Sequence, residues 1–195
     1  MINFISKLFK NDYSQENELL RLQAEMGVEQ VTLDRNLILA AIEKQALAKI
    51  ESYLTKSLTV DQSKEYEVIE EIMLLQLYMD TYMNVLEERV NITSAIHKEN
   101  TDITVFPFIL FPLIQNALTH GYNSMEKYPI RIKLRVLGNK IRLEVSNRVN
   151  HYITNQEDTL IINLFKARLN LLYPDTHTLI INSNSNIFKS TLILG

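Results

Sequence analysis

The segment Phe108-Ile-Leu-Phe-Pro-Leu-Ile-Gln-Asn-Ala-Leu-Thr-His-Gly-Tyr122 is an apolar, helix-like stretch set among strand-like segments. We expect a helix over residues 107–120. Upstream, the alternation of Val90, Ile92 and Ile96 predicts a strand. Downstream we expect two hairpins, separated by a second helix over residues 159–173. The alternating apolar residues of these hairpins are Ile130, Ile132, Leu134 and Val136 with Ile141, Leu143 and Val145, and then residues 179–181 with 188–194.

Further upstream, before residue 88, apolar residues recur three and four positions apart, which predicts helices. Residues 14–58 contain no proline and predict two helices in a hairpin. Gly27 is expected to break the run, with Thr32 or Asp34 capping the second helix. A third, largely buried helix is expected over residues 62–86. Helices and strands are thus segregated into two layers, which is typical of an α+β fold.

Composition narrows the classes of protein to consider. The chain has 195 residues, of which 46% are hydrophobic, and this suffices for one main core plus a helical appendage. The net charge is -3, and no long basic run is present, so we expect no nucleic-acid partner. No cysteine is present, which suits a reducing compartment, and we expect a cytoplasmic protein.

The opening residues 1–10 are too short an apolar segment to span a bilayer, which takes about 20 residues. They form either a short amphipathic lead-in that touches a membrane or partner, or a frayed or packed terminus. The second reading is the commoner outcome. We therefore expect no membrane contact.

The quoted segment resembles the asparagine box of LytS-type sensor histidine kinases, whose pattern is close to P-x-L-L-x-P-L-V-E-N-A-I-K-H-G. Residues 67–89 resemble the long helix that opens the ATPase domain of this family, and Arg168-Leu-Asn-Leu-Leu-Tyr-Pro174 resembles its R-L-x-L-L-Y-P segment. The resemblance implies a Bergerat-type two-layer sandwich with a mixed sheet over residues 61–195. It also implies a dimerising helical hairpin over residues 1–60. The positions matched in the box are Pro112, Leu113, Asn116, Ala117, His120 and Gly121.

The resemblance also implies a nucleotide site. Asn116 stands at the position of the asparagine that holds Mg²⁺ on the phosphates of ATP. Gln115 replaces the preceding glutamate, and an amide cannot act as a general base. His120 matches a phosphate-side histidine, although a half-buried histidine that satisfies the last carbonyls of a helix is an equal account. Asn147 occupies the place of the adenine-binding aspartate, where it can still accept a hydrogen bond from an amino group.

The glycines of the family's phosphate lid are missing. The next glycine of the adenine motif corresponds to Val149, and residues 159–164, Thr-Leu-Ile-Ile-Asn-Leu, stand where G-x-G-L-x-N is expected. β-Branched residues resist the positive φ angles and the close backbone approach that glycines allow. We expect residues 159–173 to form one helix instead, with Leu160, Ile161, Leu164 and Leu171 packed on the sheet. Such a helix would narrow or fill the nucleotide cleft.

The phosphoacceptor histidine of the family is also missing, because the four histidines are His97, His120, His151 and His177, all outside the helical first half. An ungapped alignment places Glu29 at that position. Glu29 is then either a fixed mimic of phosphohistidine or a solvated surface residue, and the second reading is preferred.

Two functions follow from these residues. The first is a pseudokinase, a homodimer without catalytic residues that binds a histidine kinase, a response regulator or another signalling partner. In this case Asn116, His120 and Asn147 form a vestigial site. The second is a kinase that binds Mg-ATP through Asn116 and Asn147 and phosphorylates a partner's histidine. We expect no cofactor, with weak Mg-ATP binding as the alternative.

Overall fold

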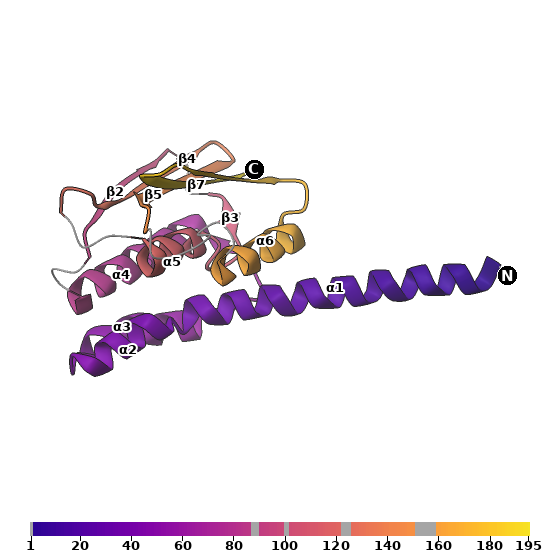
Figure 1. The fold of residues 1–195 in the computed structure, drawn as a ribbon, viewed down its shortest axis with the longest axis horizontal. Helices are drawn as coiled ribbons and strands as arrows, with labels where there is room; N and C mark the ends of the chain where they lie inside the picture. Colours follow the sequence, from indigo (N-terminus) through magenta and orange to yellow (C-terminus); the bar gives the residue numbers. More distant parts are fainter. Residues whose placement is uncertain (1, 87–89, 100–101, 122–125, 151–158) are drawn as a thin grey trace.

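The computed structural model describes residues 2–86, 90–99, 102–121, 126–150 and 159–195, with side chains described from residue 17 onwards. Three layers follow one another in Figure 1: a sheet, a middle layer of helices, and an outer layer formed by the N-terminal helices. The middle layer separates the other two. The expected α+β fold with N-terminal helices and a mixed sheet is confirmed.

The main sheet has five strands in the order β2-β4-β5-β7-β6. They are β2 (Ile92–Lys98), β4 (Ile130–Leu137), β5 (Lys140–Arg148), β6 (His177–Ser183) and β7 (Ile187–Leu194). β2 pairs with β4 in parallel, and the other neighbours are antiparallel. Alternation predicted these strands, because one face of the sheet is buried against helices while the other is open to solvent.

The middle layer consists of α4 (Val68–Leu86), α5 (Phe111–His120) and α6 (Leu160–Leu172). α5 is buried on nearly all sides, from Phe111 to Leu118. α4 is also largely buried, as expected, with Met73, Gln76 and Asp80 among its exposed positions. A small sheet that alternation did not predict, β1 (Tyr66–Glu67) paired with β3 (Thr104–Val105), flanks this layer.

The outer layer has three helices rather than the expected two: α1 (Ile2–Thr32), α2 (Arg35–Glu43) and α3 (Leu47–Thr59). The expectation that Gly27 breaks the first helix is wrong, since α1 continues to Thr32. A Cβ at Gly27 would lie 3.2 Å from the Cβ of Leu164, so this glycine lets α1 lie close against α6. Asp34 caps α2 as expected, accepting hydrogen bonds from the backbone N–H groups of Asn36 and Leu37.

Asp34 also joins the outer and middle layers. It is buried, and its Oδ2 accepts hydrogen bonds at 2.6 Å from the hydroxyl groups of Tyr78 and Tyr82 on α4. Burial and the neighbouring carboxylate raise the pKa of both phenols well above the usual value. The tyrosines therefore stay protonated and act as donors to the carboxylate.

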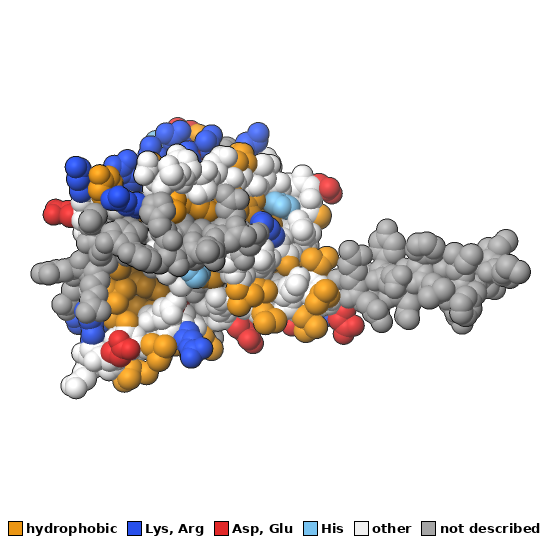
Figure 2. Space-filling model, in the orientation of Figure 1, with side chains coloured by type: hydrophobic (Ala, Val, Ile, Leu, Met, Phe, Trp, Pro, Cys, Tyr) orange, Lys and Arg blue, Asp and Glu red, His pale blue; other side chains and the backbone are white. Residues whose placement is uncertain are grey.

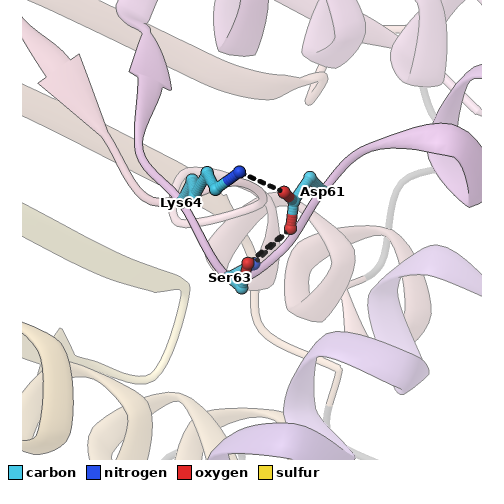
Figure 3. Close-up of polar contacts among 3 residues, drawn as sticks. All are labelled: Asp61, Ser63 and Lys64. Carbon is cyan, nitrogen blue, oxygen red and sulfur yellow. Dashed lines mark hydrogen bonds and ion pairs between the residues drawn. The ribbon is translucent and has the colours of Figure 1, made fainter.

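The chain leaves the outer layer through a turn at residues 61–64. Asp61 accepts hydrogen bonds from the backbone N–H and the hydroxyl of Ser63, and its carboxylate lies 3.4 Å from the ammonium of Lys64 (Figure 3). The proposed boundary between residues 60 and 61 falls at this turn. One hydrophobic core nevertheless runs through both parts, since Val31, Leu37 and Tyr53 belong to the same cluster as the sheet residues. Among the described residues, no helix is long and apolar enough to cross a membrane.

Candidate functional site

A buried carboxylate on α4 accepts hydrogen bonds from the backbone turn that precedes α5. Glu71 on α4 accepts hydrogen bonds from the backbone N–H groups of Phe108 and Leu110, each at 2.8 Å, and from the hydroxyl of Tyr66. Phe108 has a φ of 62°, an uncommon conformation for a large side chain. The two N–H groups lie on either side of Ile109, so Glu71 holds the strained turn from which α5 begins.

Arg168 supports the same turn from α6. Its guanidinium is buried and donates to the carbonyl of Pro107. Burial lowers the pKa of Arg168 to about 10, and the nearby Glu71 carboxylate opposes this shift. Burial also raises the pKa of Glu71, while hydrogen bonds from Tyr66, Leu110 and Phe108 and the charge of Arg168 lower it. In the sequence, Arg168 stands out only as part of a motif, and no pattern points to a role for Glu71.

Asn116, the expected metal ligand, lies on α5 with its side chain buried. Its Oδ1 accepts a hydrogen bond at 2.7 Å from the hydroxyl of Thr159. The same hydroxyl accepts from the backbone N–H of Ile162 and thereby caps α6. The amide oxygen that the resemblance assigns to a metal is therefore bonded to the N-cap residue of α6.

Gln115 is turned toward the outer layer. Its Nε2 donates to the carbonyl of Gln30 on α1 at 2.9 Å, and its Oε1 is buried without a partner among the described residues. The residue at the family's glutamate position therefore ties α5 to α1.

Asn147 lies on the inner face of β5 and is buried. Its Nδ2 donates to the carbonyl of Arg148, and its Oδ1 has no partner within the described residues. Gly121 lies against it: a Cβ at Gly121 would be 2.7 Å from Nδ2 of Asn147 and 2.4 Å from the carbonyl oxygen of Ala117. The glycine of the box therefore lets the end of α5 approach β5 closely.

His120 is four residues beyond Asn116, on the same face of α5. It is half-buried, and burial lowers its pKa. The structure thus places Asn116, His120 and Asn147 around the C-terminal half of α5, but it joins Asn116 to Thr159 rather than to Asn147. Within the described residues, no group of three or more carboxylate or imidazole side chains could hold a metal ion.

The predicted helix over residues 159–173 is present as α6, capped by Thr159 and Tyr173. Its expected contact face is partly wrong. Leu160 and Leu171 are 61% and 40% exposed. Ile161 and Leu164 are buried, but they line a small hollow with residues of α1 and α5 and do not belong to the core cluster that contains the sheet residues. The residues of α6 that join the central core are Ile162, Phe165 and Leu169. Residues 151–158, where part of the lid was expected, lie outside the described residues.

Glu29, the position aligned with the phosphoacceptor, is exposed on α1. Exposure agrees with the reading of a solvated surface glutamate. It also leaves the carboxylate accessible to a partner.

No protein-family model and no curated protein sequence matches this chain. Solved structures do. The histidine kinase domain of the blue-light activated histidine kinase EL346 from Erythrobacter litoralis is 12% identical, with a TM-score of 0.51, and the match covers 91% of this chain and 95% of that domain. Histidine kinase AdeS from Acinetobacter baumannii is 11% identical over 76% of this chain and 74% of its own, with a TM-score of 0.49. The catalytic domain of histidine kinase ThkA is 13% identical over 67% and 94%, with a TM-score of 0.46.

The match to EL346 extends over the N-terminal helices and the sandwich together. At this identity the likeness shows the fold alone, which is that of the EL346 histidine kinase domain. Of the segments that carried the sequence resemblance, residues 108–122 contain α5, and residues 168–174 begin in the last turns of α6 and run past its end.

Proposed function

We propose that this chain is a cytoplasmic two-component signalling protein of the LytS-type histidine kinase kind that acts as a pseudokinase. It binds a signalling partner, a histidine kinase or a response regulator, and does not transfer phosphate itself. It works as a homodimer. Fold similarity alone cannot assign a function, so the proposal rests on the residues of the site.

One observation carries the proposal: the hydrogen bond from Thr159 to Oδ1 of Asn116. Coordination of Mg²⁺ demands near-ideal octahedral geometry at short distance. Here the oxygen that would supply it is turned to the N-terminus of α6. A metal would have to compete with a bond that also fixes the start of that helix.

Two further features support the proposal. Gln115 lacks the carboxylate that a base requires, and its amide is engaged with α1. No histidine lies within residues 1–60, so the chain has no residue on its N-terminal helices that could accept a phosphoryl group as histidine kinases do. The remaining side chains do not fit a complete Mg-ATP site.

Calorimetric titration with Mg-ATP, together with a radiolabelled phosphotransfer assay, tests this proposal. We expect no saturable binding up to millimolar nucleotide and no labelled protein. For wild type, and separately for Asn116→Ala, the melting temperature with Mg-ATP should equal that of the same protein in buffer alone. A rise in melting temperature with Mg-ATP that Asn116→Ala abolishes would contradict the proposal, because a ligand that binds the native state stabilises it by mass action.

The second candidate is an ATP-dependent kinase that phosphorylates a partner's histidine, and one observation favours it. Oδ1 of Asn147 is buried and has no partner among the described residues, and buried acceptors are normally satisfied. The amino group of an adenine ring could donate to it. Binding of metal-free ATP or adenosine that Asn147→Leu removes and Asn150→Leu preserves would support nucleotide recognition. Transfer of label to a partner protein would establish the kinase.

A further inference from the structure

The sheet face that points away from the helices carries an excess of positive charge. Strand register and burial place Arg131, Lys133 and Arg135 of β4 on this face, together with Lys140 and Arg142 of β5 and Lys189 of β7. The described acidic residue among the outward positions of these three strands is Glu144. Figure 2 shows Lys and Arg side chains gathered over the sheet at the top of the molecule. The whole chain has a net charge of -3, so its charge is distributed unevenly.

Glu144 neutralises only part of this face. It forms ion pairs with Arg142 at 3.0 Å and with Lys189 at 2.5 Å. Within the described part of the chain, Arg131, Lys133, Arg135 and Lys140 form no ion pair. Three of these four lie at alternate positions of one strand, where like charges repel one another. A negatively charged partner would relieve this repulsion.

The same face has a hollow at one end and aliphatic side chains at one side. This hollow has a volume of about 390 Å³ and lies where β4 begins and β5 ends; its lining includes Tyr128, Arg131, Ser146 and Arg148 and also Asn147 of the candidate site. The Arg148 guanidinium lies 4.7 Å from the centre of the Tyr128 ring. Beside the basic strands, β6 and β7 direct Ile180, Ile187 and Ile193 outward, and the first two are well exposed.

Three kinds of anionic partner can be compared with this surface. Single-stranded nucleic acid is usually held by aromatic side chains on which successive bases stack. The described outward positions of the five strands carry no Phe, Tyr or Trp, and the ring of Tyr128, at the hollow, already lies against Arg148. Protein interfaces are depleted in lysine at their core, yet Lys133 and Lys189 lie within this face. An anionic bilayer attracts lysine and arginine alike and also accepts shallow aliphatic contact.

We propose that this basic sheet face docks on membranes that contain anionic phospholipids. The lipid phosphates contact the cations of β4 and β5, and Ile180 and Ile187 touch the interface beside them. On the helices, exposed acids such as Glu51 and Glu70 are interspersed with exposed cations such as Lys56, so their charges partly cancel, whereas the charges of the sheet face are mostly positive. An anionic surface therefore attracts the sheet face more strongly than the helical side. This membrane contact does not depend on phosphate transfer. It also does not involve residues 1–10, the segment from which we expected no membrane contact.

Flotation with vesicles tests the proposal. Wild type should float with vesicles of equal parts phosphatidylcholine and phosphatidylglycerol, stay unbound with pure phosphatidylcholine, and detach in high salt because surface charges are screened. The variant Arg131→Glu/Lys133→Glu/Arg135→Glu should bind at least about tenfold more weakly, because each cation near an anionic membrane contributes measurably to binding. The control Arg35→Glu/Lys44→Glu/Lys56→Glu makes the same change in charge at exposed positions of the outer layer and should bind like wild type.

A folded state common to all three proteins is checked by circular dichroism, and Arg131→Gln/Lys133→Gln/Arg135→Gln replaces the charge-reversed variant if that one does not fold. Equal flotation with neutral and anionic vesicles overturns the proposal. So does equal weakening by the sheet and helix variants. Binding of a labelled single-stranded oligonucleotide without flotation would assign the face to nucleic acid instead, and flotation failure combined with tight binding to polyglutamate would assign it to an acidic protein.

Discussion

At the scale of single residues, Glu71 shows what a pattern cannot reveal. In the sequence it is one of two acids in the first turn of a helix, a common surface position. The backbone N–H groups that donate hydrogen bonds to it, those of Phe108 and Leu110, are 37 and 39 residues away. Asp34 could be predicted as a cap because its partners lie two and three residues away, whereas its contacts with Tyr78 and Tyr82 could not.

The role of Glu71 predicts a stability effect. Glu71→Gln keeps the shape of the side chain but replaces one acceptor oxygen by an NH₂ group, so a buried N–H of the 108–110 turn loses its acceptor. We expect the free energy of unfolding to fall by roughly 1–3 kcal/mol, measured by urea denaturation. Glu70→Gln changes the exposed neighbour and should have little effect. Equal stability of the two variants would show that Glu71 does not hold the turn.

His120 predicts a dependence of stability on pH. Burial lowers its pKa in the folded protein, so the unfolded chain takes up a proton first as the pH falls. The contribution of His120 to the free energy of unfolding is therefore fully present above its ordinary pKa of about 6.5. It is lost as the pH falls from that value through the lower pKa of the folded protein. His120→Gln should flatten the pH profile of the melting temperature in this window, whereas His97→Gln, at an exposed position, should leave it unchanged. Identical profiles for His120→Gln and wild type would contradict the assignment.

At the scale of elements, the spacing of apolar residues along the sequence predicted the five strands of the main sheet and the three helices of the middle layer. It did not predict the contact faces of α6. Apolar residues occur on more than one face of this helix, because it touches α1 and α5 as well as the core. Periodicity reports that a side chain is apolar and does not report which neighbour covers it. Leu160 and Leu171 therefore looked like core residues, although both are exposed.

The contact between α1 and α6 predicts the effect of filling Gly27. A Cβ there would already lie 3.2 Å from the Cβ of Leu164, so the branched side chain of Gly27→Val must push the helices apart. We expect a loss of about 1–3 kcal/mol, as for overpacking elsewhere, and recovery of part of it on adding Leu164→Ala. Glu29→Val, at an exposed position of the same helix outside the apolar stripe of Leu19, Leu22 and Met26, provides the matched control for valine in a helix. If Gly27→Val is no less stable than Glu29→Val, the helices do not need this close approach.

At the scale of the whole molecule, the separation into a hairpin of residues 1–60 and a sandwich of residues 61–195 remains a prediction. The two parts share one core cluster and are joined by the bonds of Asp34 to α4 and of Gln115 to α1. Sequence resemblance supplied the boundary because it compares segments along the chain. It could not supply the contacts between layers, since these depend on side chains that are far apart in sequence.

The outer layer also predicts how two copies of the chain associate. Leu19, Leu22 and Met26 lie three and four residues apart on α1 and are 51–56% exposed, so they form an apolar stripe on a helix whose first half extends beyond the rest of the molecule (Figure 1). A second copy can cover this stripe in a symmetric contact. We expect a dimeric mass by light scattering at tens of micromolar protein, and a monomeric mass for Leu19→Glu/Met26→Glu. Leu160→Glu/Ile180→Glu introduces the same charges at exposed apolar positions on α6 and β6 and should remain dimeric. A monomeric wild type, or a dimer that survives the α1 substitutions, would show that α1 does not form the interface.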